Sequence, residues 1–288
     1  MSNIQDATLF VVATPIGNLE DITQRAISIL SSVDVILAED TRITAKLLAS
    51  LNIKNDQKLI SCHDFNEESR VQEVKRFLDD EKRVALVSDA GTPLISDPGY
   101  KIVASLRQED YNIVSIPGVS AVITALSVAG LPSDNFTFKG FLSAKKTKRQ
   151  EQIKEIQKLH TTVIVYESVH RIRYMLEDLA ELLPNYKIAV AKELTKQFEK
   201  VVSGSAKQVY DYFEDNQDII RGEFVVIIDC NSQQVQKQTT GVNADDLIKE
   251  LLFELPLKKV VKIVVNILKV KKNDVYQRAL EIKSEMEG

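Results

Sequence analysis

Two glycine signatures are missing from this 288-residue chain, and their absence disfavours several common classes of enzyme. No two of its 10 glycines stand at positions i and i+2, so there is no dinucleotide-binding fingerprint, and no Walker A motif occurs. The sequence therefore argues against nicotinamide- and flavin-dependent enzymes and against nucleoside-triphosphate enzymes. It also argues against the commonest methyltransferase fold, which opens on a glycine-rich loop of the same kind.

Cysteine, long apolar runs and positive net charge are lacking as well. The 2 cysteines, Cys62 and Cys230, lie far apart and have no metal-ligand spacing. Together with a polar N-terminus that lacks a signal-peptide pattern, they favour a reduced, cytoplasmic setting. No apolar run approaches the roughly 18 residues of a membrane span, so no membrane association is expected. The net charge of −4 excludes a general binder of polyanions, so any nucleic-acid contact requires local basic patches.

Alternation of apolar strands with amphipathic helices predicts an α/β protein with several domains. A parallel, doubly wound sheet is expected over residues 1–118, with strands at 8–13, 34–38, 58–61, 83–88 and 112–116. A second α/β domain is expected over 119–230, with strands near 136–140, 161–166, 186–191, 197–203 and 223–229. The polar stretch 231–243 has the composition of a linker, and 244–288 carries three short helical patterns.

The most informative stretch is 88–99, which follows the apolar strand 84–87 and holds two Asp, two Gly and two Pro. In an open α/β sheet, ligands gather at the carboxyl ends of such strands. Gly91 permits close approach of the backbone to a ligand, Pro93 stiffens the turn, and Asp89 supplies a carboxylate. The alternative is a βα turn that binds no ligand, and the presence of two Asp, two Gly and two Pro in twelve residues disfavours it.

Polar clusters follow other expected strands too. Glu39 and Asp40 follow the second strand, although Asp40 could equally cap the next helix. His63 and Asn66 follow the third strand, and we favour substrate contact there over a metal site, because only one histidine is present. Further clusters lie at 14–18, 117–121, 166–171 and 191–196. A cleft between the two domains would collect all of them.

Two basic blocks contain no acidic residue. They are formed by Lys139, Lys145, Lys146, Lys148 and Arg149, and by Lys258, Lys259, Lys262, Lys269, Lys271 and Lys272. Such runs are usually solvated helix faces. On an acidic protein, two of them also fit a surface that contacts phosphates.

The strand-end segments together resemble one family, the tetrapyrrole-methylase superfamily, and within it the small-subunit ribosomal RNA methyltransferase I group. The resemblance covers about residues 7–230 and is carried above all by the 88–99 motif. Residues 244–286 also look like the small helical C-terminal domain of that group. Val169 stands where a proline is common, which should leave its loop slightly less rigid.

The resemblance implies S-adenosyl-L-methionine as cofactor, folded in a cleft between the parallel sheet and a mixed second sheet. It implies 2′-O-methylation of a cytidine ribose in small-subunit (16S) ribosomal RNA, with the RNA or the 30S subunit as partner, and usually a homodimer. By position, it implies cofactor contacts at Gly17, Asp89, Gly91, Thr92, Ser120, Ala121 and Tyr166, and near the last strand at Gly222 and Phe224.

Methyl transfer to a hydroxyl gains from a nearby base or cation, by roughly 10²–10⁴-fold, and requires no metal. The candidates are Lys192, Glu193, Glu39 and Glu67, among which the sequence does not choose. Candidate RNA contacts are Arg42, His63, Asn66, Lys145, Lys146, Arg171, Lys258 and Lys259. Two alternatives stay open, a tetrapyrrole methyltransferase of the same fold and a non-catalytic RNA-binding protein. The first would make little use of the basic blocks, and the intact 89–93 turn speaks against the second.

Overall fold

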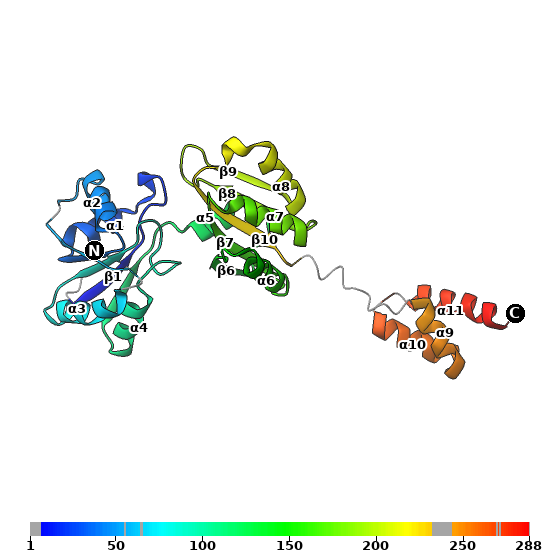
Figure 1. Cartoon of the computed structure of the whole chain (residues 1–288). Helices are drawn as coiled ribbons and strands as arrows, with labels where there is room; N and C mark the ends of the chain where they lie inside the picture. Colours follow the sequence, from blue (N-terminus) through cyan, green and yellow to red (C-terminus); the bar gives the residue numbers. More distant parts are fainter. Residues whose placement is uncertain are drawn as a thin grey trace. The chain divides into compact units, whose positions relative to one another are not determined.

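The computed structural model describes residues 7–54, 56–63, 66–231, 244–268, 270 and 272–287. The chain divides into two compact units, Met1–Asn231 and Ser232–Gly288 (Figure 1). The expected linker lies outside the described residues except for Asn231.

The first sheet is entirely parallel and has the strand order β3-β2-β4-β1-β5. Its strands are β1 (Thr8–Val12), β2 (Val35–Ala38), β3 (Lys58–Ser61), β4 (Val84–Val87) and β5 (Asn112–Ile116). Strands β2 and β4 are buried along their whole length, as expected for central strands that are covered on both faces.

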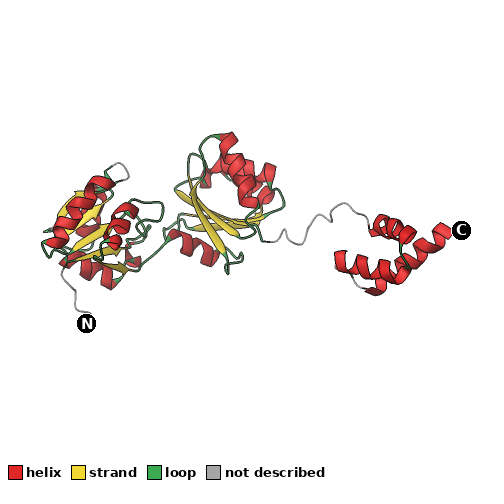
Figure 2. Ribbon diagram, turned by 90° about the horizontal axis from the view of Figure 1, so that it is seen from below, coloured by secondary structure: helices red, strands yellow, loops and turns green. Residues whose placement is uncertain are grey.

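Helices cover both faces of this sheet (Figure 2). Successive strand residues point to opposite faces, so each face has its own apolar cluster. On one face the sheet packs against α1 (Gln24–Ser32) and α2 (Thr41–Ser50). On the other it packs against α3 (Glu67–Asp79) and α4 (Tyr100–Gln108). The predicted doubly wound parallel sheet is confirmed.

The second sheet is mixed and has the order β6-β7-β10-β8-β9. Its strands are β6 (Phe136–Phe141), β7 (Thr162–Ser168), β8 (Lys187–Lys192), β9 (Lys200–Ser205) and β10 (Glu223–Asp229). Only the β6–β7 pair is parallel among these neighbours. One face packs against α6 (Lys146–Gln157), α7 (Ile172–Leu182) and α8 (Ala206–Asp215). The other face packs against α5 (Ala121–Val128).

Strand β9 begins at Lys200, three residues later than its expected start. The preceding residues form a loop, in which Glu193 (φ 50°) and Thr195 (φ 63°) adopt left-handed conformations. Left-handed residues cannot continue an extended strand. The strand pattern of the sequence does not reveal this loop.

Arg149 of the first basic block is buried rather than solvated. Its Nε donates to Asp178 Oδ2 at 2.6 Å, and the two side chains are 4% and 0% exposed. Its Nη1 also donates to the carbonyls of Ser143 and Ala144. The exposed part of this block therefore consists of its lysines.

The C-terminal unit contains α9 (Ala244–Glu254), α10 (Leu257–Leu268) and α11 (Lys272–Glu287). The three helices bury a small core of their own around Ile248, Val264 and Ala279. This confirms the small helical C-terminal domain of the expected fold. Among the described residues, no helix is long and apolar enough to cross a membrane.

Replacement of Gly99 by alanine tests the turn that ends the 88–99 loop. Gly99 has a φ of 124°, and an added Cβ would lie 2.6 Å from Leu86 Cδ2 in the core. We expect Gly99→Ala to lower the free energy of unfolding by about 2–4 kcal/mol, because both backbone strain and overpacking arise. Gly130→Ala is the matched control, with a φ of 66° and no atom within 4 Å of the added Cβ. It should cost only about 1 kcal/mol. Equal losses in urea unfolding would contradict the steric argument.

Candidate active site

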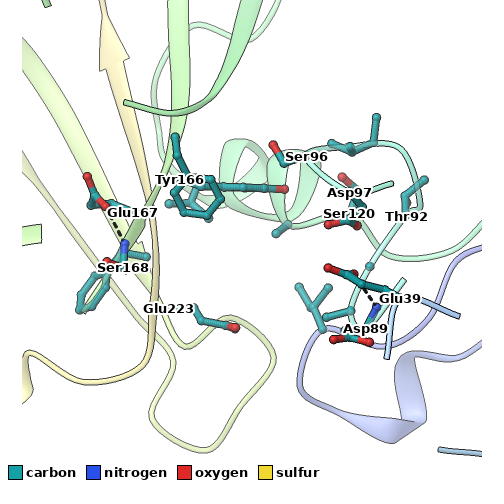
Figure 3. A pocket seen from close by; sticks show the side chains of 18 residues that line it. Glu39, Asp89, Thr92, Ser96, Asp97, Ser120, Tyr166, Glu167, Ser168 and Glu223 are labelled. Atoms are coloured by element: carbon teal, nitrogen blue, oxygen red, sulfur yellow. Dashed lines mark hydrogen bonds between the residues drawn. The ribbon is translucent and has the colours of Figure 1, made fainter. Parts of the chain in front are cut away.

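A cavity of about 380 Å³ lies within the first unit, at the carboxyl edge of the parallel sheet (Figure 3). It is bordered by residues of the loops that follow β1, β2, β4 and β5. Strands β6, β7 and β10 supply its remaining border. This volume is within the usual range of small-molecule sites, roughly 300–1,000 Å³.

Backbone hydrogen bonds fix the two loops that carry the strongest sequence motifs. Thr14 N–H donates to the Gly91 carbonyl at 2.8 Å, and Gly91 N–H donates back to the Thr14 carbonyl at 3.0 Å. Thr14 is 1% exposed, and its hydroxyl also donates to the Ser88 carbonyl at 3.2 Å. Gly91 has a φ of 82°, a conformation that glycine adopts without strain. The loops after β1 and β4 are therefore joined at Gly91, which lines the cavity.

A second pair of hydrogen bonds joins the loops after β2 and β4. Asp40 N–H donates to Asp89 Oδ1 at 2.9 Å, and Asp89 N–H donates to Glu39 Oε2 at 3.3 Å. Burial raises the pKa of Asp89, although the hydrogen bond from Asp40 opposes the shift. Glu39 and Asp89 thus hold each other's loop in place, and both border the cavity.

Strand register decides which side chains of β7 and its neighbours face the cavity. Tyr166 pairs with Val225, which pairs with Ala191, and this row lies on the α5 side of the sheet. Figure 3 shows Tyr166 extending toward Ser96 and Asp97. Burial raises the pKa of Tyr166 to about 12, so its hydroxyl stays protonated.

The adjacent row of residues lies on the opposite face. Glu167 pairs with Phe224, which pairs with Lys192, and Phe224 packs among α7 and α8 residues, 6.2 Å from the Phe213 ring. Phe224 borders the cavity, but its ring belongs to the core and is 2% exposed. Glu167 is turned away from Ser96 and Asp97 (Figure 3). Lys192 donates instead to the Ile219 carbonyl at 2.7 Å.

A charged cluster lies at the ends of β8 and β10. Lys196 Nζ lies 3.0 Å from Glu193 Oε1 and 3.1 Å from Glu223 Oε2. Gly222 allows this packing, because a Cβ there would meet the Glu193 carboxylate at 1.8 Å. Gly17 is needed for a similar reason, since its Cβ would lie 2.4 Å from Lys196 Cγ. Gly17 and Gly222, two of the three glycines expected at the cofactor, therefore accommodate a side-chain cluster beside the cavity and do not line it.

The cavity is acidic. Five acidic residues line it: Glu39, Asp89, Asp97 and Glu223, together with Glu167, which is paired with Arg171 (Figure 3). No lysine, arginine or histidine is among the described residues that line it. Such a site favours a ligand with positive charge and repels phosphates.

Most of the expected cofactor residues lie together at this cavity. It is lined by Asp89, Gly91, Thr92, Ser120, Ala121, Tyr166 and Phe224. Thr92 Oγ1 donates to the Val119 carbonyl at 3.1 Å, which joins the β4 loop to the start of α5. Ser120 is the residue before α5, and its side chain makes no capping bond.

Of the four candidate bases, only Glu39 borders the cavity. Glu67 is 5% exposed and accepts hydrogen bonds from the backbone N–H groups of Gly99 and Lys101, so it caps α4. A carboxylate in that place stabilises the helix N-terminus. Lys192 lies on the other face of the sheet, and Glu193 is held by Lys196 beside the cavity.

The candidate RNA contacts are spread over several loops. Arg42 has a side chain 85% exposed and is paired with Asp40. His63 and Asn66, which follow β3 in the chain, hydrogen-bond to each other. Arg171 is paired with Glu167 at 2.7 Å. Lys145 and Lys146 are exposed at the start of α6.

In the C-terminal unit, Lys258 and Lys259 are exposed on α10. A groove of this unit is lined by three lysines, Lys258, Lys262 and Lys272, with Asn266 and Tyr276 beside them. Lys259 is not part of this groove.

Sequence reasoning missed several lining residues: Ile16, Ile95, Asp97, Phe141, Glu223 and Val225. Asp97 belongs to the 88–99 motif, but the composition of that motif does not single it out. Phe141 and Glu223 carry no local signal, because strand pairing brings them to the site. No group of three or more His, Cys, Asp or Glu in the described part of the chain is placed to hold a metal ion.

Solved structures share this fold at low sequence identity. Diphthine synthase matches with a TM-score of 0.59 and 13% identity, over 77% of this chain and 89% of that chain. The cobalamin biosynthetic enzyme cobalt precorrin-4 methyltransferase matches with a TM-score of 0.55 and 20% identity, over 77% and 94%. The family model of the tetrapyrrole (corrin/porphyrin) methylases matches residues 8–210. Fold and site together thus define a protein of the tetrapyrrole-methylase class.

Sequence relatives narrow the class. Residues 238–283 match the RsmI C-terminal HTH domain. Ribosomal RNA small subunit methyltransferase I of Vibrio cholerae serotype O1 is 44% identical over 95% of this chain and 94% of its own length. Its counterpart in Escherichia coli O157:H7 is 41% identical over 95% and 94%. The chain belongs to the ribosomal RNA small subunit methyltransferase I family.

Replacing Lys196 by methionine tests the cluster beside the cavity. Burial alone would raise the pKa of Glu193, but hydrogen bonds from Lys196 and the Glu223 N–H outweigh it, and the pKa is lowered. Glu193 therefore contributes stability above its unfolded pKa of about 4.3, and this contribution is lost as pH falls through the depressed folded value. We expect Lys196→Met to raise the pKa of Glu193 in an NMR titration. The stability deficit should be largest near neutral pH and should vanish in acid.

Lys207→Met is the matched control, because it removes the same charge from an exposed pair with Asp211. It should leave the pKa of Glu193 unchanged. Equal effects of the two variants would show that net charge, and not the Lys196 contact, sets this pKa.

Proposed function

We propose that this protein transfers the methyl group of S-adenosyl-L-methionine to the ribose 2′-hydroxyl of a cytidine in small-subunit ribosomal RNA. The observation that carries the proposal is the acidic cavity, found in a chain whose relatives are named as ribosomal RNA small subunit methyltransferases. A relative in fold, uroporphyrin-III C-methyltransferase from Thermus thermophilus, was solved with S-adenosyl homocysteine.

The charge of the cavity fits this cofactor. S-adenosyl-L-methionine carries a sulfonium and an ammonium against one carboxylate, so it is a net cation. Asp89, Asp97 and Glu223 border the cavity, and no basic residue is among the described residues that line it, although Lys196 pairs with Glu223 from beside the cavity. Dinucleotides and nucleoside triphosphates carry phosphates, which this field repels.

The residues that would hold the cofactor are those of the β4 and β5 loops together with Tyr166. Gly91 leaves room for close approach, and Ser120 and Tyr166 offer hydroxyl groups. When bound, the cofactor supplies an electrophilic methyl carbon on a positively charged sulfur. The work of the protein is then to bring the acceptor oxygen in line with that carbon.

Glu39 is the proposed acceptor of the hydroxyl proton. It borders the cavity and accepts a single hydrogen bond from the Asp89 N–H among those described above, whereas Glu67, Lys192 and Glu193 do not line the cavity. A carboxylate beside the acceptor oxygen orients the hydroxyl and takes up its proton as the oxygen–carbon bond forms. This proton transfer from the hydroxyl to Glu39 does not require a metal ion.

The RNA is bound, in this proposal, outside the acidic cavity. Residues 244–288 form an RNA-binding domain joined by the 231–243 segment to the two α/β domains, 1–118 and 119–230. The lysine-lined groove supports this role, because it places three cations beside an aromatic ring. We also propose that the protein acts on the 30S subunit in the cytoplasm and that it forms a homodimer.

Binding of the cofactor is tested at Asp89. Asp89→Asn should weaken binding of S-adenosyl-L-methionine in calorimetry by about 1–3 kcal/mol, because the negative charge that faces the cationic cofactor is removed. Binding of S-adenosyl homocysteine, which lacks the sulfonium charge, should weaken less. Asp211→Asn on α8 is the control for a change in net charge. Unchanged affinity in a folded Asp89→Asn protein would remove this carboxylate from the site.

Binding of RNA is tested in the full chain by changing Lys258, Lys262 and Lys272 to glutamine. The triple variant should bind 30S subunits more weakly and reduce the salt slope of log K by about 1 for each phosphate that a lysine no longer neutralises. The affinity for S-adenosyl-L-methionine should not change. Glutamine at the exposed Lys154, Lys158 and Lys207 gives the same change in net charge. An equal effect of both triple variants would contradict a specific role of the groove.

A further inference from the structure

Phe141 is an exposed aromatic residue at the border of the cavity. It is the last residue of β6, it lines the cavity, and it is 52% exposed. Large aromatic side chains bury much of their surface in a folded core, so this exposed ring offers apolar contact area beside a polar site.

Fixed groups hold the ring in place. The Tyr166 ring meets it edge to face, with centroids 5.7 Å apart and an interplanar angle of 63°. The Arg171 guanidinium lies 5.7 Å from its centroid. Arg171 is itself tied down, since Nη1 donates to the Leu142 carbonyl and Nη2 pairs with Glu167. The ring is therefore positioned before any ligand arrives, while half of its surface stays open.

The surroundings of Phe141 indicate what this surface can take. Ile95 borders the same cavity and is 39% exposed, so a second apolar side chain is available to a flat ligand. Lys145 and Lys146 follow a few residues after Phe141 and are exposed. An apolar, aromatic surface that is followed closely along the chain by exposed cations matches a nucleotide, with its flat base and its phosphate.

We propose that Phe141 is the stacking platform for the target nucleobase. In this proposal the base unstacks from the adjacent bases of the RNA and stacks on the Phe141 ring. Lys145 and Lys146 contact the flanking phosphates, and the ribose of the same nucleotide reaches the cavity. This inference rests on the proposed methylation of RNA. It explains how a neutral sugar enters an acidic cavity while its phosphates stay outside. Enzymes that modify a base take it out of the stack, and in this proposal the same movement brings the attached ribose to the cavity.

The test compares Phe141→Ala, Phe141→Leu and Phe141→Trp in the full-length protein. The assay measures methyl transfer from labelled S-adenosyl-L-methionine to 30S subunits that lack the modification, and it also measures binding of a short single-stranded RNA that contains cytidine. Phe141→Ala and Phe141→Leu should raise the KM for the subunit and the Kd for the short RNA by roughly ten- to a hundredfold. Phe141→Trp should retain most of the RNA affinity, because the aromatic surface is kept.

Phe136→Leu is the matched control. Phe136 lies on the same strand and is 38% exposed, but it does not line the cavity. The control variant should keep the KM and Kd of the wild-type protein. A similar loss in Phe136→Leu and Phe141→Leu would overturn the proposal, since it would indicate a general effect of the strand.

Two other outcomes would also overturn it. If Phe141→Leu retains RNA affinity but loses a dimer in analytical ultracentrifugation, the ring contacts a second copy of the chain. If the variant loses affinity only for S-adenosyl-L-methionine, the ring belongs to the cofactor site. The wild-type protein distinguishes these outcomes from failure of the proposed function. If the proposed function is wrong, the wild-type protein itself binds RNA without transferring a methyl group.

Discussion

The mutual backbone hydrogen bonds of Thr14 and Gly91 are the interaction on which the candidate site depends. They join the loops after the adjacent strands β1 and β4 at a place where Thr14 is almost fully buried. The other connections start from these two loops. Asp89 binds the β2 loop, Thr92 binds the β5 loop, and Asn18 N–H donates to Thr195 Oγ1 on the far side, at the β8–β9 loop. Parallel strands make this possible because their carboxyl ends meet at one edge of the sheet.

Separation of charge resolves a conflict in the proposed reaction. A cationic methyl donor is stabilised by carboxylates, whereas the RNA acceptor is a polyanion that carboxylates repel. The chain places Glu39, Asp89, Asp97 and Glu223 at the cavity, and exposed lysines at the start of α6 and on α10. In the proposed reaction, an acceptor whose phosphates are bound by lysines presents a neutral sugar to the carboxylates of the cavity. Without this separation, one surface would have to bind ligands of opposite charge.

Four of the nine non-glycine residues with positive φ in the described part of the chain lie in two loops at the site. Leu94 and Ser96 in the β4 loop, and Glu193 and Thr195 in the β8–β9 loop, have φ values between 50° and 73°. Each such residue costs on the order of 1 kcal/mol, so it persists only where the surrounding contacts hold it. The first loop carries Ile95 and Asp97 to the cavity, and the second carries the Glu193–Lys196 pair beside it. These irregular conformations place side chains where no regular helix or strand would.

The sequence by itself determined the class of fold and the loops at which the site is found. Apolar periodicity acts over a few residues, and turn-forming residues such as Gly91 and Pro93 mark the strand ends directly.

Only the tertiary structure decided which side chains of those loops face the cavity. Glu167 and Lys192 follow the same pattern as Tyr166 in the sequence, yet register across β7, β10 and β8 turns them to the opposite face. Glu67 accepts a hydrogen bond from the Gly99 N–H at a helix N-terminus 32 residues away in the chain. Arg149 donates a hydrogen bond to the buried Asp178. Phe141 and Glu223 joined the site through strand pairing alone. Such contacts depend on distances across the fold, which no local pattern of residues records.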